Sequence, residues 1–90
     1  MTEKDLIPGT VVQHFKRKML TEAERADSTQ YLYEILGVAH HTETGEKLVV
    51  YRALYGEGKI CARPLDMFLS ETDNEKYPQA EQKFRFETLK

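Results

Sequence analysis

The sequence lacks tryptophan, has a single cysteine, Cys61, and contains no long apolar run among its 90 residues. One cysteine excludes an internal disulfide and is typical of a reducing compartment, so we expect a cytoplasmic protein. The N-terminal residues carry no apolar stretch long enough for a signal peptide, and no segment is long enough to cross a bilayer. We therefore expect no membrane partner.

An excess of either charge is also missing. Thirteen basic and fifteen acidic residues give a formal net charge of −2 at pH 7. The two signs are interspersed, and no segment has the basic excess that indicates nucleic-acid binding by itself. A chain of this length forms one domain with a small core.

The chain is organised around a predicted β-hairpin from Tyr31 to Tyr55. Two apolar runs rich in β-branched and aromatic residues flank the polar residues 42–46, a pattern typical of a hairpin. Gly45 supplies the positive φ that a short turn requires. Gly37 lies inside the first strand, where a glycine often marks a bulge. Neither strand alternates cleanly, which indicates a curved sheet that is partly covered on both faces.

Three further strands and one helical turn are expected outside the hairpin. The strands are predicted at 10–15, 59–63 and 83–87, and a 3₁₀ turn at 64–68 is expected to place Leu65, Met67 and Phe68 in the core. The last strand alternates strictly and is expected to pair with the first. Residues 1–8 are expected to form a loose lead-in, and 70–82 a polar connection.

Residues 17–30 have the character of an insertion on the surface. Thr21 and Glu24 form a capping box that starts a helix ending near Asp27. The apolar face of this helix is thin. The preceding Lys16-Arg17-Lys18 cluster is interpreted as a solvated loop, with contact to a phosphate backbone as the alternative.

These elements predict an all-β fold, a small SH3-like barrel of about five strands with a short inserted helix. We expect a single SH3-like β-barrel domain over residues 1–90, with the insertion at 17–30. An OB-like barrel with the inserted helix as its plug ranks second, because the helix comes too early for that arrangement.

Five motifs keep a characteristic order along residues 8–71. They are His14-Phe15-Lys16, Tyr33-Glu-Ile-Leu-Gly-Val-Ala-His40, His41-Thr-Glu-Thr-Gly-Glu46, Val49-Val-Tyr-Arg-Ala-Leu-Tyr-Gly56 and Arg63-Pro-Leu-Asp-Met-Phe68. Together they resemble a family of small bacterial proteins classed only as a domain of unknown function. The resemblance implies an SH3-like domain and no established activity. Two features depart from the family pattern: the insertion at 17–30, and the absence of a tryptophan near Cys61 that would offer a stacking platform.

Tyrosines are the leading candidates for a binding surface. Tyr51 and Tyr55 share one face of a predicted strand, and Tyr31 and Tyr33 share a face of the other. In an SH3-like barrel such rings line a groove, where they stack on peptide prolines or on bases. The alternative is that two or more of them are core residues whose hydroxyls reach water. The candidate ligand-binding residues are Tyr33, Tyr51, Tyr55, Arg52, Arg63, His14, Lys16, His40 and Glu43.

Metal ligation and thiol chemistry find little support. A set of His14, His40, Glu43 and Cys61 has no ligand spacing behind it, so we expect no metal and no cofactor. Positive charge near Cys61 lowers the pKa of a thiol, but a nucleophile also needs an oriented base. We therefore interpret Cys61 as a buried, inert residue.

The leading hypothesis is a non-enzymatic cytoplasmic binding module. Its Tyr/Arg-lined groove would bind a protein segment or a nucleic acid, and the sequence does not choose between these partners. A second hypothesis is a small enzyme, or a ligand-responsive subunit of one, with a site made of His14, His40, Glu43 and Arg63. A third is a structural domain that forms homo-oligomers through its edge strands.

Overall fold

A five-stranded antiparallel sheet forms the body of the protein in our computed structural model, which describes residues 1–89. The strand order is β4-β3-β2-β1-β5. The strands are β1 (Val11–His14), β2 (Leu32–His40), β3 (Lys47–Ala53), β4 (Ile60–Pro64) and β5 (Phe86–Thr88). The prediction of a mostly β fold is confirmed. The prediction of a closed barrel is wrong, because β4 and β5 are the two edges of one open sheet.

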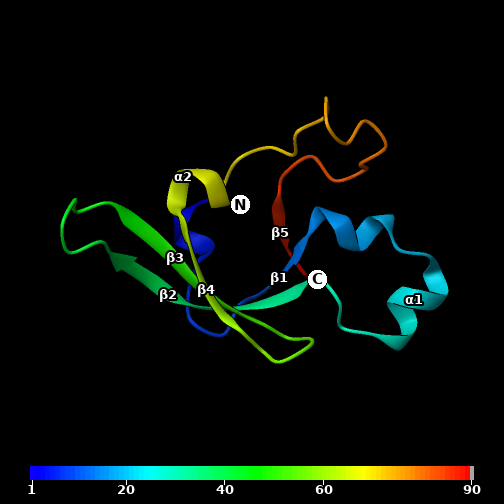
Figure 1. The fold of residues 1–90 in the computed structure, drawn as a ribbon, viewed down its shortest axis with the longest axis horizontal. Coiled ribbons are helices and arrows are strands. Elements are labelled where there is room, and N and C mark those ends of the chain that lie inside the picture. Colours follow the sequence, from blue (N-terminus) through cyan, green and yellow to red (C-terminus); the bar gives the residue numbers. More distant parts are fainter. Residues whose placement is uncertain (90) are drawn as a thin grey trace.

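The β2–β3 hairpin is the longest feature of the sheet and extends to one side of the molecule (Figure 1). Its register shifts between Ile35 and Gly37, which confirms the predicted bulge at this glycine. Gly45 has a φ of 75° in the hairpin turn, the conformation that a glycine was expected to supply. Val12 of β1, Ile35 of β2 and Val49 of β3 are fully buried at the centre of the sheet.

Aromatic rings complete the core. Phe68 and Phe86 are almost completely buried and stack face to face, with their centroids 4.1 Å apart. Phe68 belongs to α2 (Leu65–Phe68), a single α-helical turn in place of the expected 3₁₀ turn. Leu65 packs against the core as predicted, whereas Met67 is 50% exposed because it lies on the outer side of this turn.

The N-terminal end of the chain is more ordered than predicted, whereas the last strand is shorter than predicted. Residues 1–8 contain the 3₁₀ turn η1 (Glu3–Asp5), and the following Leu6 is only 4% exposed within the core. The expected pairing of the last strand with the first is confirmed, although β5 starts three residues later than predicted. Phe84 instead forms an isolated bridge with Glu71.

A buried glutamine anchors the irregular segment 70–85, of which residues 70–82 had been predicted as a polar connection and 83–85 as the start of the last strand. Gln82 is 1% exposed, and its side-chain amide donates to the carbonyl of Gln13 in β1 at 3.2 Å and to that of Phe84 at 2.8 Å. Gln13 in turn donates from its own amide to Gln82 Oε1. The buried Thr72 hydroxyl donates to the Gln82 carbonyl at 2.9 Å. These bonds fix the segment beside the sheet.

The insertion lies at the opposite end from the hairpin tip (Figure 1). It begins within η2 (Phe15–Met19) and contains the helix α1 (Glu22–Asp27), and both bonds of the predicted capping box between Thr21 and Glu24 are present. The Arg17 guanidinium donates to the carbonyls of Ser28, Gln30 and Arg25. Arg17 therefore closes the insertion on itself, and only Lys16 of the basic cluster turns toward a pocket.

Candidate functional site

A groove of about 480 Å³ lies on the face formed by β2, β3 and β4. Because side chains alternate between the two faces of a strand, Tyr51 and Ala53 of β3 meet Tyr33 of β2 and Cys61 of β4 on one face. We call this the tyrosine groove. It is lined by Tyr33, Tyr51, Ala53, Tyr55, Gly56, Glu57, Lys59, Cys61 and Arg63.

The tyrosine rings in the groove support one another edge to face. The ring centroids of Tyr33 and Tyr51 are 5.3 Å apart, and those of Tyr33 and Tyr55 are 5.6 Å apart. The hydroxyls of Tyr33 and Tyr55 share a hydrogen bond of 2.6 Å. Burial, followed by this bond, raises the pKa of Tyr33, so the phenol stays neutral. Tyr51 is a core residue, whereas Tyr33 and Tyr55 are half-buried and present part of each ring to the groove.

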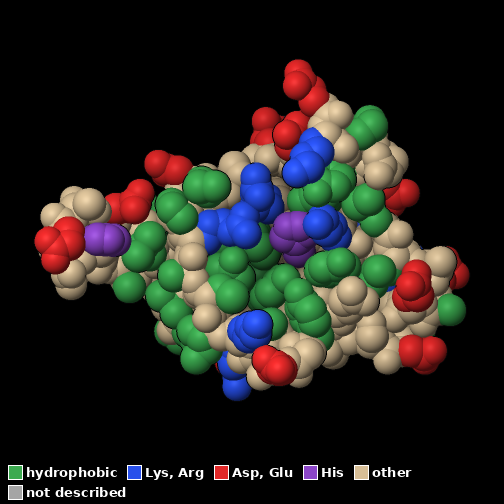
Figure 2. Space-filling view, viewed as in Figure 1, with side chains coloured by type: hydrophobic (Ala, Val, Ile, Leu, Met, Phe, Trp, Pro, Cys, Tyr) green, Lys and Arg blue, Asp and Glu red, His purple; other side chains and the backbone are tan. Residues whose placement is uncertain are grey.

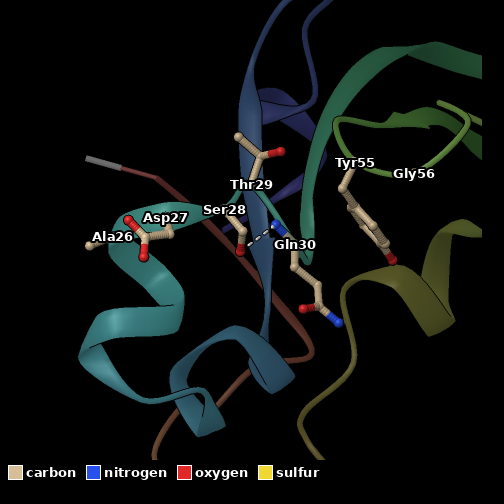
Figure 3. A pocket seen from close by; sticks show the side chains of 7 residues that line it. All are labelled: Ala26, Asp27, Ser28, Thr29, Gln30, Tyr55 and Gly56. Atoms are coloured by element: carbon tan, nitrogen blue, oxygen red, sulfur yellow. Dashed lines mark hydrogen bonds between the residues drawn. The ribbon is translucent and has the colours of Figure 1, made fainter.

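Tyr55 also borders a second hollow on the side of the insertion (Figure 3). This open depression is lined by residues 26–30 together with Tyr55 and Gly56. Within this depression the backbone amide of Gln30 donates a hydrogen bond to the Ser28 hydroxyl. The Thr29 hydroxyl donates to the carbonyl of Leu54, which ties the insertion to the chain beside Tyr55. The insertion therefore builds the outer wall around this ring.

Arg63 connects the tyrosine groove to a third hollow of about 290 Å³, because its side chain lines both. We call this hollow the basic pocket. It is lined by His14, Phe15, Lys16, Arg63, Asp73, Lys76, Tyr77 and Arg85. Figure 2 shows the corresponding gathering of basic side chains around a histidine near the middle of one face.

Aromatic rings hold several cations of the basic pocket in place. Lys16 Nζ and Lys76 Nζ lie 5.5 Å and 5.6 Å from the centroid of the Tyr77 ring. The guanidinium of Arg63 lies 5.6 Å from the centroid of Phe86. Cation–π contacts of this kind restrain a basic side chain and leave its N–H donors free. The pocket thus has both charge and a defined shape.

His14 contributes a neutral imidazole to the pocket. Its Nδ1 accepts a hydrogen bond from the Lys16 amide at 3.1 Å, which places the ring proton on Nε2. Burial, and then the charges of Lys16, Arg63 and Arg85, lower the pKa of His14 to about 4. His14 therefore adds a neutral N–H donor at pH 7.

The structure does not bring all predicted site residues together. Arg52 lies on the opposite face of β3 from Tyr51 and pairs with Glu34, so it does not line the groove. His40 and Glu43 are exposed near the hairpin tip and line neither hollow. His40 lies eight residues along β2 from Leu32, and Leu32 pairs with Gln13, the neighbour of His14 in β1. At the rise per residue of a strand, this spacing separates His40 from His14 by about 25 Å. The proposed four-residue catalytic set is not assembled.

Several lining residues were not anticipated from the sequence. Lys76 and Tyr77 come from residues 70–82, which had been taken for a polar connection, and Arg85 comes from the strand predicted at 83–87. An aromatic residue in a polar stretch was the available signal, since Tyr77 packs on Phe15 with centroids 4.9 Å apart. Cys61 is exposed, and its predicted burial is wrong because β4 is an edge strand.

Residues 1–89 hold neither a grouped set of metal ligands nor a membrane-spanning helix. No three His, Cys, Asp or Glu side chains in this range are grouped as ligands for a metal ion. None of the helices in it has the length and apolar character needed to traverse a membrane.

Comparison with known proteins gives one result at the level of the whole domain. No curated protein and no solved structure matches the chain. The model of one family, described as "Protein of unknown function (DUF1653)", matches residues 10–88, which include all five strands and both main hollows. The chain therefore belongs to this family of unknown function.

Proposed function

We propose that the protein is a binding module whose tyrosine groove receives an unpaired base of a single-stranded nucleic acid. The observation that carries this proposal is the junction at Arg63, where a wall of tyrosine rings meets a pocket of basic side chains. Single strands are bound by this combination, because the bases stack on aromatic rings while cations follow the phosphates.

The size and rigidity of the groove support the proposal. A volume of about 480 Å³ lies within the range of sites for small-molecule ligands, which includes groups the size of a base. The Tyr33–Tyr55 hydrogen bond and the edge-to-face contacts fix the rings before a ligand arrives. A preformed site binds more tightly, because less free energy is lost in ordering side chains on binding. Lys59 at the rim adds a further positive charge.

Titration of the full chain with a fluorescent single-stranded oligothymidylate, followed by anisotropy, tests the proposal. We expect Tyr55→Ala to weaken binding about tenfold, because stacking contributes about 1–3 kcal/mol per base. Tyr55→Phe keeps the ring and is expected to bind within about threefold of the wild type, since it loses only a hydroxyl. Arg52→Gln is the charge control, because Arg52 lies on the other face.

Three results contradict the proposal. They are the absence of saturable binding, equal binding by Tyr55→Ala and the wild type, or equal losses in Tyr55→Ala and Arg52→Gln. Binding of a proline-rich peptide that the oligonucleotide does not displace would assign the groove to a protein segment instead.

The strand order also supports an SH3-like arrangement that remains open between β4 and β5. The order β5-β1-β2-β3-β4 and the single helical turn before the last strand agree with that family of folds. We further propose the cytoplasm as its location, because an exposed free thiol at Cys61 suits a reducing compartment.

A second candidate function is self-association through β4. Within residues 1–89 no strand pairs with the outer side of this edge strand, which carries the 66% exposed Ile60. Size-exclusion chromatography over a hundredfold range of concentration measures it. A constant monomer elution volume would remove this candidate and leave the binding proposal in place.

A further inference from the structure

We propose that the basic pocket is a phosphate-binding site in its own right, built from side chains that four separate segments bring together. The inference deepens the proposed function, because Arg63 is shared with the tyrosine groove. It does not depend on a base occupying that groove.

The first argument is the local balance of charge. The whole chain has an acidic excess, yet Lys16, Arg63, Lys76 and Arg85 converge on one hollow of about 290 Å³ that contains a single acidic residue. Cations that share a concave site repel one another, and the repulsion is weakened less by solvent than on a flat surface. An anion bound in the pocket offsets this repulsion between the cations.

The second argument is that these cations have no carboxylate partner within 4 Å among residues 1–89. Ion pairs within 4 Å join Lys47 to Glu3, Arg52 to Glu34 and Lys83 to Glu71, and none of the described pairs involves the pocket. In the one acidic lining residue, Asp73, the Oδ1 atom accepts hydrogen bonds from the backbone amides of Glu75 and Lys76. Its carboxylate organises the loop that carries Lys76.

The third argument is the geometry of the donors. The Tyr77 ring supports both lysines, the Phe86 ring supports Arg63, and the Ser70 hydroxyl accepts from Arg85 Nε at 3.3 Å. Each cation is thus held by a neutral partner that leaves donors free for a ligand. His14 contributes Nε2–H, since its Nδ1 is occupied by the Lys16 amide. Guanidinium, ammonium and imidazole donors that line one hollow suit the tetrahedral oxygens of a phosphate.

The ligand class is therefore a phosphate group, and two sources offer that chemistry. A free phosphate or phosphomonoester carries more charge, while the phosphodiester of a nucleic acid brings a base to the neighbouring groove. Inorganic phosphate, a thymidine dinucleotide with one phosphodiester, and phosphate-free thymidine are the three probes that separate these sources.

Amide NMR shifts of the full chain, measured at constant ionic strength, provide the test. We expect inorganic phosphate to give saturable shifts at residues 14–16, 63, 76–77 and 85. Lys16→Gln and Lys76→Gln are each expected to weaken phosphate binding about fivefold, the effect of roughly 1 kcal/mol from one charged contact. Lys83→Gln removes the same charge outside the pocket and is the matched control, since this exposed lysine pairs with Glu71.

The outcomes distinguish this inference from the proposed function. Phosphate binding that survives in Tyr55→Ala supports a separate phosphate site, whereas tighter binding of the dinucleotide than of both other probes supports the nucleic-acid source. Shifts that do not saturate, or that weaken equally in Lys83→Gln and Lys76→Gln, overturn the phosphate site. In that case oligonucleotide binding lost only in Tyr55→Ala would leave the tyrosine groove standing.

Discussion

The tyrosine groove and the basic pocket share Arg63 but are built in different ways. Tyr33, Tyr51 and Tyr55 belong to one hairpin and its end, so the groove depends on strand pairing between neighbours in the sequence. The basic pocket joins Lys16 to Lys76 and Arg85, which come from distant parts of the chain. A local structure positions the rings, whereas tertiary packing alone positions the charges.

The two sites therefore depend on different contacts within the protein. The groove survives as long as β2 and β3 pair, because its rings contact one another directly. The basic pocket requires the segment 70–85 to stay docked on β1, and that docking rests on the buried Gln82. A substitution that releases this segment should therefore weaken binding at the basic pocket and leave binding at the tyrosine groove unchanged.

The largest expected effect is that of Gln82→Ala. The substitution leaves buried carbonyls without their donor and should lower the free energy of unfolding by about 2 kcal/mol. Docking of 70–85 is lost in part, so phosphate binding should fall more than tenfold while the tyrosine groove keeps its affinity for a base. Denaturant unfolding and the two titrations measure these changes.

Gln79→Ala is the matched control, because Gln79 is exposed in the same segment. It should change stability by less than about 0.5 kcal/mol. Equal loss of both binding activities in Gln82→Ala would show that the two sites are one structural unit and would contradict the comparison.

An intermediate effect is expected from pH. His14 has a pKa of about 4 in the folded protein and about 6.5 when unfolded, so the unfolded chain binds more protons between these values. Stability from this group is complete above pH 6.5 and is lost as the pH falls toward 4. We expect a loss of roughly 1–2 kcal/mol after allowance for solvent screening at a half-buried site.

Unfolding of the wild type and of His14→Asn at several pH values checks this expectation. Asparagine keeps an acceptor for the Lys16 amide and does not titrate, so the variant should show a smaller dependence on pH. Saturating phosphate should also reduce the dependence in the wild type, because an anion offsets the charges that disfavour protonation. Identical pH profiles for both proteins would refute the assignment.

The smallest effects are expected at the hairpin tip. His40→Ala and Glu43→Ala remove exposed side chains that line neither site, so each should change stability by less than about 0.5 kcal/mol and leave both titrations unchanged. Loss of phosphate or base binding in either variant would show that the tip folds over a site.

Much of the fold followed from local patterns in the sequence. The hairpin, the bulge at Gly37 and the capping box at Thr21 were predicted because turn residues, capping residues and apolar β-branched runs act over a few residues. Openness of the sheet was not predicted, since closure depends on whether distant edges meet. The exposure of Cys61 was missed for the same reason, because an apolar edge strand resembles an apolar central strand in sequence.

The candidate sites divide in the same way. The sequence by itself put Tyr51 and Tyr55 on one face of their strand, because residues an even number apart share a face, but the register that aligns Tyr33 with them came only from the structure. Only the tertiary structure decided that Lys76 and Arg85 join Lys16 and Arg63 around His14. Their meeting depends on the burial of Gln82 and on the packing of Tyr77, which are long-range contacts that no local pattern encodes.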